Sequence, residues 1–209
     1  HRTCKALVAH GAKHLVLIDS ISERRAPTAG RVNEAEQMSK EEWSSYRERI
    51  TTSARIGAEE YGLTVGIHAH AAGFMDFEPE LERLLSEVDE EILKICFDTG
   101  HHSYAGFDPV EFMQKYISRI SYVHFKDIDP EVKQKVLDNR TGFYDACGQG
   151  IFCNLGDGDV DFPTVRKILL ENNFEGWCTV EQDCDPLLDP NPLSDAQLNR
   201  EYLETIGFK

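Results

Sequence analysis

Six short apolar segments alternate with segments of helical periodicity, and this alternation constrains the fold more than any other feature of the chain. The apolar segments have the length of strands, whereas the segments between them repeat their apolar residues every three or four positions. Such alternation predicts a parallel β-sheet covered by helices. The six expected strands lie at residues 14–19, 63–70, 92–98, 120–127, 150–155 and 177–183.

A parallel sheet of this kind can be an open doubly wound sheet or a closed barrel. No glycine-rich phosphate turn follows any expected strand, which argues against an open nucleotide-binding sheet. A (β/α)8 barrel has eight strands and typically about 250 residues. No repeat or linker divides the chain, which begins with a helix-like pattern at residues 2–10. We therefore expect a single α/β barrel domain over residues 1–209 that lacks the first two βα units in this sequence.

Capping residues indicate where several helices begin. Ser39 and Glu42 have the spacing of a capping box, and Pro79 is placed as the first residues of a helix often are. Further helices are expected to begin near residues 108, 161 and 194, with a short one at residues 131–140.

Four of the expected strands end in side chains that can bind a metal or a proton. Because side chains alternate along a strand, one face of each strand is apolar and the other carries the polar group. Barrels place their chemistry at the carboxyl ends of their strands, facing the axis. The four residues are His68, Asp98, His124 and Glu181.

Two imidazoles and two carboxylates suit a divalent cation that keeps open positions for a ligand. Burying two carboxylates without a cation would be costly, and a metal ion supplies the compensating charge. The donor set alone does not choose among manganese, cobalt, iron and zinc.

The net charge of the chain limits the kinds of molecule that it can bind. Its formal net charge is −15 at pH 7, which makes nucleic acid an unfavourable partner. No apolar run approaches the roughly 18 residues needed to span a bilayer, and no signal peptide is visible. The six cysteines contain no C-x-x-C pair. We therefore expect reduced thiols in a cytoplasmic protein that acts on a small molecule.

Five stretches resemble the xylose isomerase-like TIM-barrel superfamily of sugar isomerases, epimerases and dehydratases. Within it, the chain looks most like the branch of inosose (2-keto-myo-inositol) dehydratases. The stretches are "GIHAH", "CFDTGHHSYAGFDP", "RISYVHFKDID", "LGDGDVDFPTV" and "EGWCTVEQD".

The resemblance implies a metal held by residues from four strands. Asp98, His124 and Glu181 match the ligand positions of the family directly. His68 stands where the family often has a glutamate. The cofactor implied is Mn2+ or Co2+, with Zn2+, Fe2+ or Mg2+ as alternatives.

The chemistry implied is removal of a proton beside a ketone, followed by loss of a hydroxyl as water. Glu181 or His70 would take the proton, and His101 or Lys126 would assist the leaving hydroxyl or bind substrate oxygens. Asp127 and Asp183 either orient Lys126 and other groups around the site or form ion pairs on the surface. His102 is expected to be exposed. Tyr104 either reaches the pocket or packs in its loop.

Other functions compete with a keto-cyclitol dehydratase. A ketose isomerase or epimerase would use the same barrel, but it needs matched proton-transfer groups on both faces of the substrate. A non-catalytic sugar-binding protein is a third reading, and the acidic charge argues against the endonucleases of the superfamily. The substrate is expected to be a small polyol or keto-sugar, and a homo-oligomer is compatible with the sequence.

Two long connections, residues 20–32 and 129–150, have the length of active-site lids. Arg24, Arg25 and Arg140 could close over a hydroxylated substrate or could remain solvated. "GDGDVDF" resembles a phosphate loop, but its aspartates repel phosphate, so a turn with Asp161 as helix cap is the better interpretation.

Overall fold

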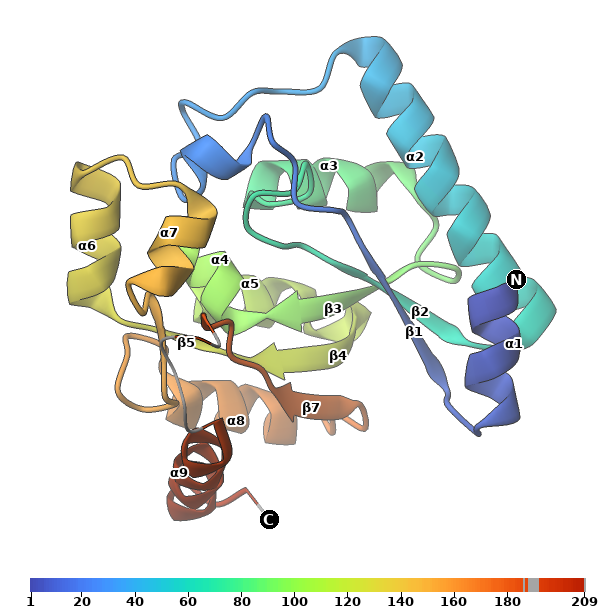
Figure 1. Ribbon diagram of the computed structural model, residues 1–209. Coiled ribbons are helices and arrows are strands. Elements are labelled where there is room, and N and C mark those ends of the chain that lie inside the picture. The colour runs from blue at the N-terminus through green and yellow to red at the C-terminus, as the bar shows by residue number, and fades with distance from the viewer. Residues whose placement is uncertain (186, 188–191, 209) are drawn as a thin grey trace.

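A computed structural model describes residues 1–185, 187 and 192–208. Its main sheet is parallel and curls so that helices cover its outer face (Figure 1). The register brings His68 beside Cys96 and Asp98 beside His124, so the polar strand ends become neighbours. The five strands, in spatial order, are β1 (His14–Ile18), β2 (Thr64–His68), β3 (Lys94–Asp98), β4 (Ile120–Phe125) and β7 (Trp177–Val180).

The expected strand at residues 150–155 forms, but not in the main sheet. Its core, β6 (Phe152–Cys153), pairs antiparallel with β5 (Asp127–Ile128). The prediction of six barrel strands was therefore wrong, and the described residues supply five of the eight strands of a closed barrel. The pattern misled because a short apolar segment can form a strand in a side hairpin as well as in a barrel.

The predicted helices all form. The capping box of Ser39 and Glu42 is present, and the side chains of Asp108, Asp129 and Asp161 cap helices that have proline in the first turn. The last helix includes Pro192, earlier than the expected start at residue 194, and α4 and α7 were not predicted. The α-helices are α1 (Arg2–Ala9), α2 (Lys40–Arg55), α3 (Glu78–Glu87), α4 (Thr99–Tyr104), α5 (Pro109–Tyr116), α6 (Pro130–Asp138), α7 (Phe143–Gly148), α8 (Phe162–Glu171) and α9 (Pro192–Thr205). Single turns lie at η1 (Ala26–Thr28), η2 (Ile56–Glu60) and η3 (Ile117–Arg119). Each helix in the described part of the chain is too short or too polar to cross a membrane.

The outer face of the sheet forms the main hydrophobic core. Ile67, Phe97 and Val123 are at most 2% exposed and pack against the apolar faces of the helices. Burying a side chain of this size contributes roughly 1.5–3 kcal/mol. The opposite face carries His68, Asp98 and His124, so the predicted division of the strands into an apolar and a polar face is confirmed.

The two long connections meet beyond the carboxyl ends of the strands, where η1, α6 and α7 gather (Figure 1). Arg31 in the first connection donates hydrogen bonds to the Thr141 and Arg140 carbonyls of the second, at 3.3 and 3.5 Å. Tyr104 is fully buried in a second apolar cluster with Phe152 and Phe143, so it packs there, at the end of helix α4 and not in a loop. This cluster covers the carboxyl end of the sheet.

Several loop predictions are corrected or refined by their contacts. His102, expected to be exposed, is 5% exposed among aromatic rings, because α4 turns it toward Phe112 and Phe97. The "GDGDVDF" segment is a turn: the Asp127 carboxylate accepts backbone N–H bonds from Gly156, Gly158, Val160 and its neighbour Ile128. The three loop arginines pair with glutamates: Arg24 with Glu36 and Glu42, Arg25 with Glu80, and Arg140 with Glu34.

Candidate metal centre and catalytic residues

The four predicted metal ligands meet at the carboxyl ends of their strands. His68 and Asp98 are the last residues of β2 and β3, His124 lies one residue before the end of β4, and Glu181 directly follows β7. The His124 Nδ1 atom is 3.0 Å from Glu181 Oε2 and 3.6 Å from Asp98 Oδ2. The rings of His68 and His124 have centroids 4.7 Å apart. Alternation of side chains together with parallel register produces this cluster.

The "DTG" within the stretch "CFDTGHHSYAGFDP", residues 98–100, has a physical explanation. The Asp98 carboxylate caps α4 by accepting the His101 N–H at 2.8 Å. Thr99 Oγ1 donates to the Lys126 carbonyl at 2.7 Å and accepts the Lys126 N–H at 3.1 Å. A Cβ atom on Gly100 would lie 2.5 Å from Lys126 Cγ, so only glycine lets α4 approach that side chain. The motif therefore attaches α4 to Lys126, the residue between β4 and β5.

The donor atoms of the cluster fit a divalent cation. Within the described residues, His68 Nδ1 is buried without a hydrogen-bond partner. Asp98 Oδ2, His124 Nδ1 and Glu181 Oε2 are buried too, and they contact one another and Lys126 as ion pairs. A buried polar atom without a partner is rare and costly. One donor atom each of His68, Asp98 and Glu181 lie within 4.8 Å of one another, so a bound cation would contact all three residues. The residues therefore suit a metal of the kind predicted.

A second grouping of donors competes with the predicted one. The donor atoms of His68, Asp98, His101 and Glu181 all lie within 4.8 Å of one another, with His101 in place of His124. Both nitrogens of His101 already have partners, however: Nδ1 accepts the Ala71 N–H at 3.4 Å, and Nε2 lies 2.7 Å from Lys126 Nζ. We favour His124 because its ring faces the carboxylates of both Glu181 and Asp98, at 3.0 and 3.6 Å from its Nδ1.

Lys126 joins the acidic groups of the site. Its side chain is 1% exposed, and its Nζ lies 2.9 Å from Asp183 Oδ2, 3.1 Å from Glu181 Oε2 and 3.4 Å from Asp98 Oδ2. Burial lowers the pKa of Lys126, but the negative charges of Asp98, Asp183 and Glu181 raise it by more. The pKa of Lys126 therefore lies above its ordinary value. The ammonium therefore already offsets part of the buried negative charge. Asp183 contacts Lys126 and His101, as the orienting role predicts, whereas Asp127 instead holds a turn.

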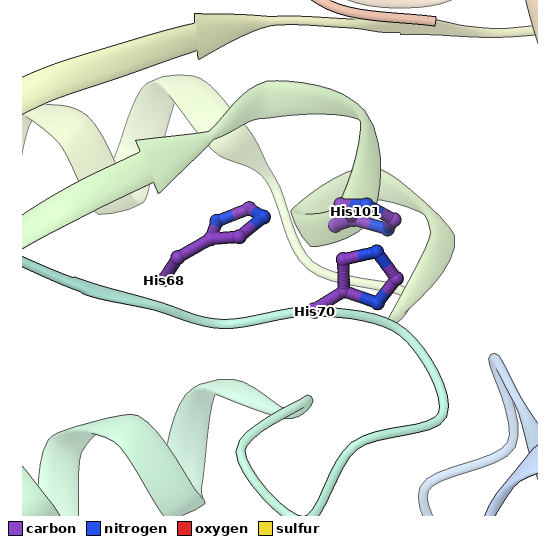
Figure 2. A group of neighbouring side chains, drawn as sticks. All are labelled: His68, His70 and His101. Atoms are coloured by element: carbon purple, nitrogen blue, oxygen red, sulfur yellow. The ribbon is translucent and has the colours of Figure 1, made fainter. Parts of the chain in front are cut away.

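His70 and His101 form a second part of the site. Figure 2 shows their rings close together, with His68 apart toward β3. The ring centroids of His70 and His101 are 3.9 Å apart. His70 Nδ1 lies 2.8 Å from the Ala71 carbonyl, so Nδ1 carries the proton and Nε2 is the basic nitrogen. Phe143 and Phe152, which the sequence gave no reason to single out, pack against His70 and His101.

The ionisable groups of the site differ in their protonation states. Burial lowers the pKa of His68 to about 3 and that of His70 to about 4, so both are neutral at neutral pH. Burial raises the pKa of Glu181, but the hydrogen bond to His124 and the charge of Lys126 outweigh it and bring the value to about 2. Burial also lowers the pKa of His124, yet Asp98, Cys96 and Glu181 raise it to about 12. Without metal His124 therefore carries a proton, which a metal ion would displace.

The family model described as xylose isomerase-like TIM barrel matches residues 1–206. The chain belongs to this family. The predicted family and α/β barrel class are confirmed.

An inosose dehydratase of Clostridium botulinum is 37% identical over 164 residues, which cover 78% of this chain and 54% of that protein. The rhizopine catabolism protein MocC of Rhizobium meliloti is 32% identical over 197 residues, which cover 94% of this chain and 60% of that protein. The chain thus spans about half the length of the curated relatives it matches.

Several solved structures share the fold at low identity. The IOLI protein, crystallised with a zinc atom, matches 98% of this chain and 66% of its own with a TM-score of 0.69 and 16% identity. The probable 3-DHS dehydratase AsbF of Bacillus anthracis matches 98% of this chain and 69% of its own with a TM-score of 0.69 and 20% identity. An L-ribulose 3-epimerase matches 98% of this chain and 64% of its own with a TM-score of 0.66 and 13% identity.

The turn after β2 contains a buried acid that makes stability depend on pH. Asp76 Oδ2 accepts the Ala72 N–H at 3.0 Å, while its Oδ1 is buried and has no partner among the residues that the structure describes. Burial raises the pKa of Asp76 to about 7, although the Ala72 bond and Arg25 lower it; Glu80 adds to the rise. Between about pH 4 and 7 the folded state therefore holds a proton that the unfolded state has lost, so stability falls as pH rises.

We expect Asp76→Asn to remove this slope. Asparagine keeps an oxygen that can accept the Ala72 N–H but has no charge to bury. The free energy of unfolding of Asp76→Asn relative to the unmodified protein should rise between pH 4 and 7 by up to ~1.4 kcal/mol per pH unit, measured by urea unfolding. A constant difference across that range would contradict the raised pKa.

Proposed function

We propose that the protein is a metal-dependent dehydratase of a keto-cyclitol resembling 2-keto-myo-inositol. The observation that carries the proposal is the convergence of His68, Asp98, His124 and Glu181 at the strand ends, where His68 Nδ1 is buried without a partner among the described residues. The inosose dehydratases that are 32–37% identical to the chain support the substrate class. The small substrate and the cytoplasmic location belong to the same proposal.

The four residues would hold the ion, which would supply positive charge to the oxygens of a bound ketone and its neighbouring hydroxyl. Glu181 is ionised and reaches the cluster, so it can accept the proton from the carbon beside the ketone. His70 Nε2 is the alternative base. The Lys126 ammonium, oriented by Asp183 and His101, can donate to the departing hydroxyl. Phe143 and Phe152 exclude water from this end of the site.

Elimination fits these residues better than epimerisation. An epimerase needs a proton-transfer group for each face of the substrate, and the family often uses a glutamate at the position of His68. A buried, neutral imidazole replaces that carboxylate here. An ammonium donor placed beside a carboxylate base is instead the pair that loss of water requires. A ketose epimerase remains the second candidate because epimerases share the fold.

The test is an assay with 2-keto-myo-inositol after removal of metal and readdition of Mn2+, Co2+ or Zn2+. Water loss would create a dione chromophore, whereas epimerisation would conserve mass. We expect metal-dependent formation of the dione, and Glu181→Ala should lower turnover at least ~100-fold because it removes the base. Glu175→Ala, which changes an exposed glutamate, is the matched control.

His68→Ala tests the ligand set separately from the base. Its main effect should be weaker metal binding, so a higher metal concentration should restore part of the activity. Full activity after complete chelation would overturn the proposed mechanism. A product of unchanged mass would show that the protein is an epimerase and not a dehydratase.

A further inference from the structure

A buried thiol lies directly below the carboxylates of the site. Cys96 precedes Asp98 by two residues, faces the same side of β3 and is fully buried. Its Sγ atom is 3.5 Å from His124 Nε2. One donor atom each of His68, Cys96 and His124 lie within 4.8 Å of one another. These three residues come from three neighbouring strands, β2, β3 and β4.

The orientation of His124 is that of a metal ligand. Its Nε2 faces Cys96, while its Nδ1 lies 3.0 Å from Glu181 Oε2 and 3.6 Å from Asp98 Oδ2. A histidine that binds a metal through one nitrogen usually presents the other to a carboxylate or carbonyl. His68 adds a second buried imidazole, 2% exposed, whose Nδ1 has no hydrogen-bond partner in the described part of the chain.

We infer that His68, Cys96 and His124 form a second cation position, deeper than the carboxylates, for a thiophilic divalent ion such as zinc or cobalt. One sulfur and two nitrogen donors favour such ions over manganese or magnesium. The thiol would lose its proton to solvent when the ion binds. The two positions share both histidines, so an ion in one displaces an ion from the other. The inference stands on the donor geometry and does not require the proposed reaction.

The test is the absorption spectrum of the full chain loaded with Co2+. A bond from the Cys96 thiolate to cobalt should give a sulfur-to-cobalt charge-transfer band in the near ultraviolet. The band should be lost in Cys96→Ser, and zinc affinity should fall roughly 10–100-fold or more. Cys178→Ser is the control, because Cys178 packs on the helix-covered side of β7 and should leave the band unchanged.

A result in the unmodified protein is enough to overturn the inference, and so is one in the variant. Absence of the band at saturating Co2+ would do so, as would its persistence in Cys96→Ser. If Cys96→Ser does not fold by circular dichroism, Cys96→Ala serves in its place. A protein that shows the band but does not dehydrate 2-keto-myo-inositol would disprove the proposed reaction and leave this cation position standing.

Discussion

Replacing Lys126 by methionine should lower the free energy of unfolding of the metal-free protein by about 3–5 kcal/mol. Methionine preserves most of the buried stem but removes the ammonium that lies within 3.4 Å of Asp98, Asp183 and Glu181. Asp98 is 3% exposed and would be left without its nearest full positive charge. Removing one partner of a buried ion pair is costly because the other charge remains buried.

Metal ions should offset part of this loss. An ion held by His68, Asp98, His124 and Glu181 supplies positive charge near the position of the ammonium and no longer competes with it. We therefore expect saturating metal to raise the melting temperature of Lys126→Met more than that of the unmodified protein. Urea unfolding with chelator and with metal measures both effects.

Turnover should not recover with stability. If the Lys126 ammonium donates to the departing hydroxyl, Lys126→Met should remain about 10²–10⁴-fold slower in kcat with metal bound. Lys115→Met is the matched control, because it removes an exposed lysine paired with Glu82 on the surface. Its stability and turnover should stay close to those of the unmodified protein. Equal losses in the two variants would contradict the charge network.

The four strand-end residues could be predicted because a strand has a simple rule. Side chains alternate, so the apolar residues Ile67, Phe97 and Val123 identify the covered face and assign His68, Asp98 and His124 to the other. Parallel strands then bring their carboxyl ends to one edge of the sheet. Neither step requires knowledge of contacts between distant residues. The same rule assigns Cys96 to the polar face, although the sequence gives no measure of its distance from His124.

Residues in the long connections could not be predicted in this way. Phe143 reaches the histidines because α7 folds back over the strand ends, and no periodicity in that connection foretells the return. His102 became buried because α4, attached through Thr99 and Gly100, rotates it toward Phe112. The roles of such residues depend on tertiary contacts, which a local pattern does not contain.

Arg24 and Arg25 show most clearly what a local pattern cannot predict. The sequence gives no way to tell which of two adjacent arginines is buried. Arg24 is exposed and pairs with Glu36 and Glu42 on the surface. Arg25 is 1% exposed: it donates to both Glu80 oxygens, at 2.8 and 3.2 Å, and to the Glu36 carbonyl at 2.9 Å. Its guanidinium also lies over the rings of Phe74 and Phe77.

We expect Arg25→Met to lower the free energy of unfolding by about 3–5 kcal/mol, because it leaves the Glu80 carboxylate, 12% exposed, without its cation. Arg24→Met should leave that free energy nearly unchanged. Glu80 also accepts the backbone N–H groups of Asp76 and Phe77, so the loss should loosen the turn that follows His70. Faster amide exchange in residues 71–77 would report this loosening.

The double variant separates loss of the ion pair from loss of packing. If the unpaired Glu80 charge causes most of the destabilisation, adding Glu80→Gln to Arg25→Met should recover part of the stability, because glutamine can still accept the two N–H groups. The two substitutions would then be non-additive in urea unfolding, as expected for residues in contact. Additive losses would mean that Arg25 acts through its contacts with Phe74 and Phe77 instead, and that the ion pair with Glu80 contributes little to holding the connection over the site.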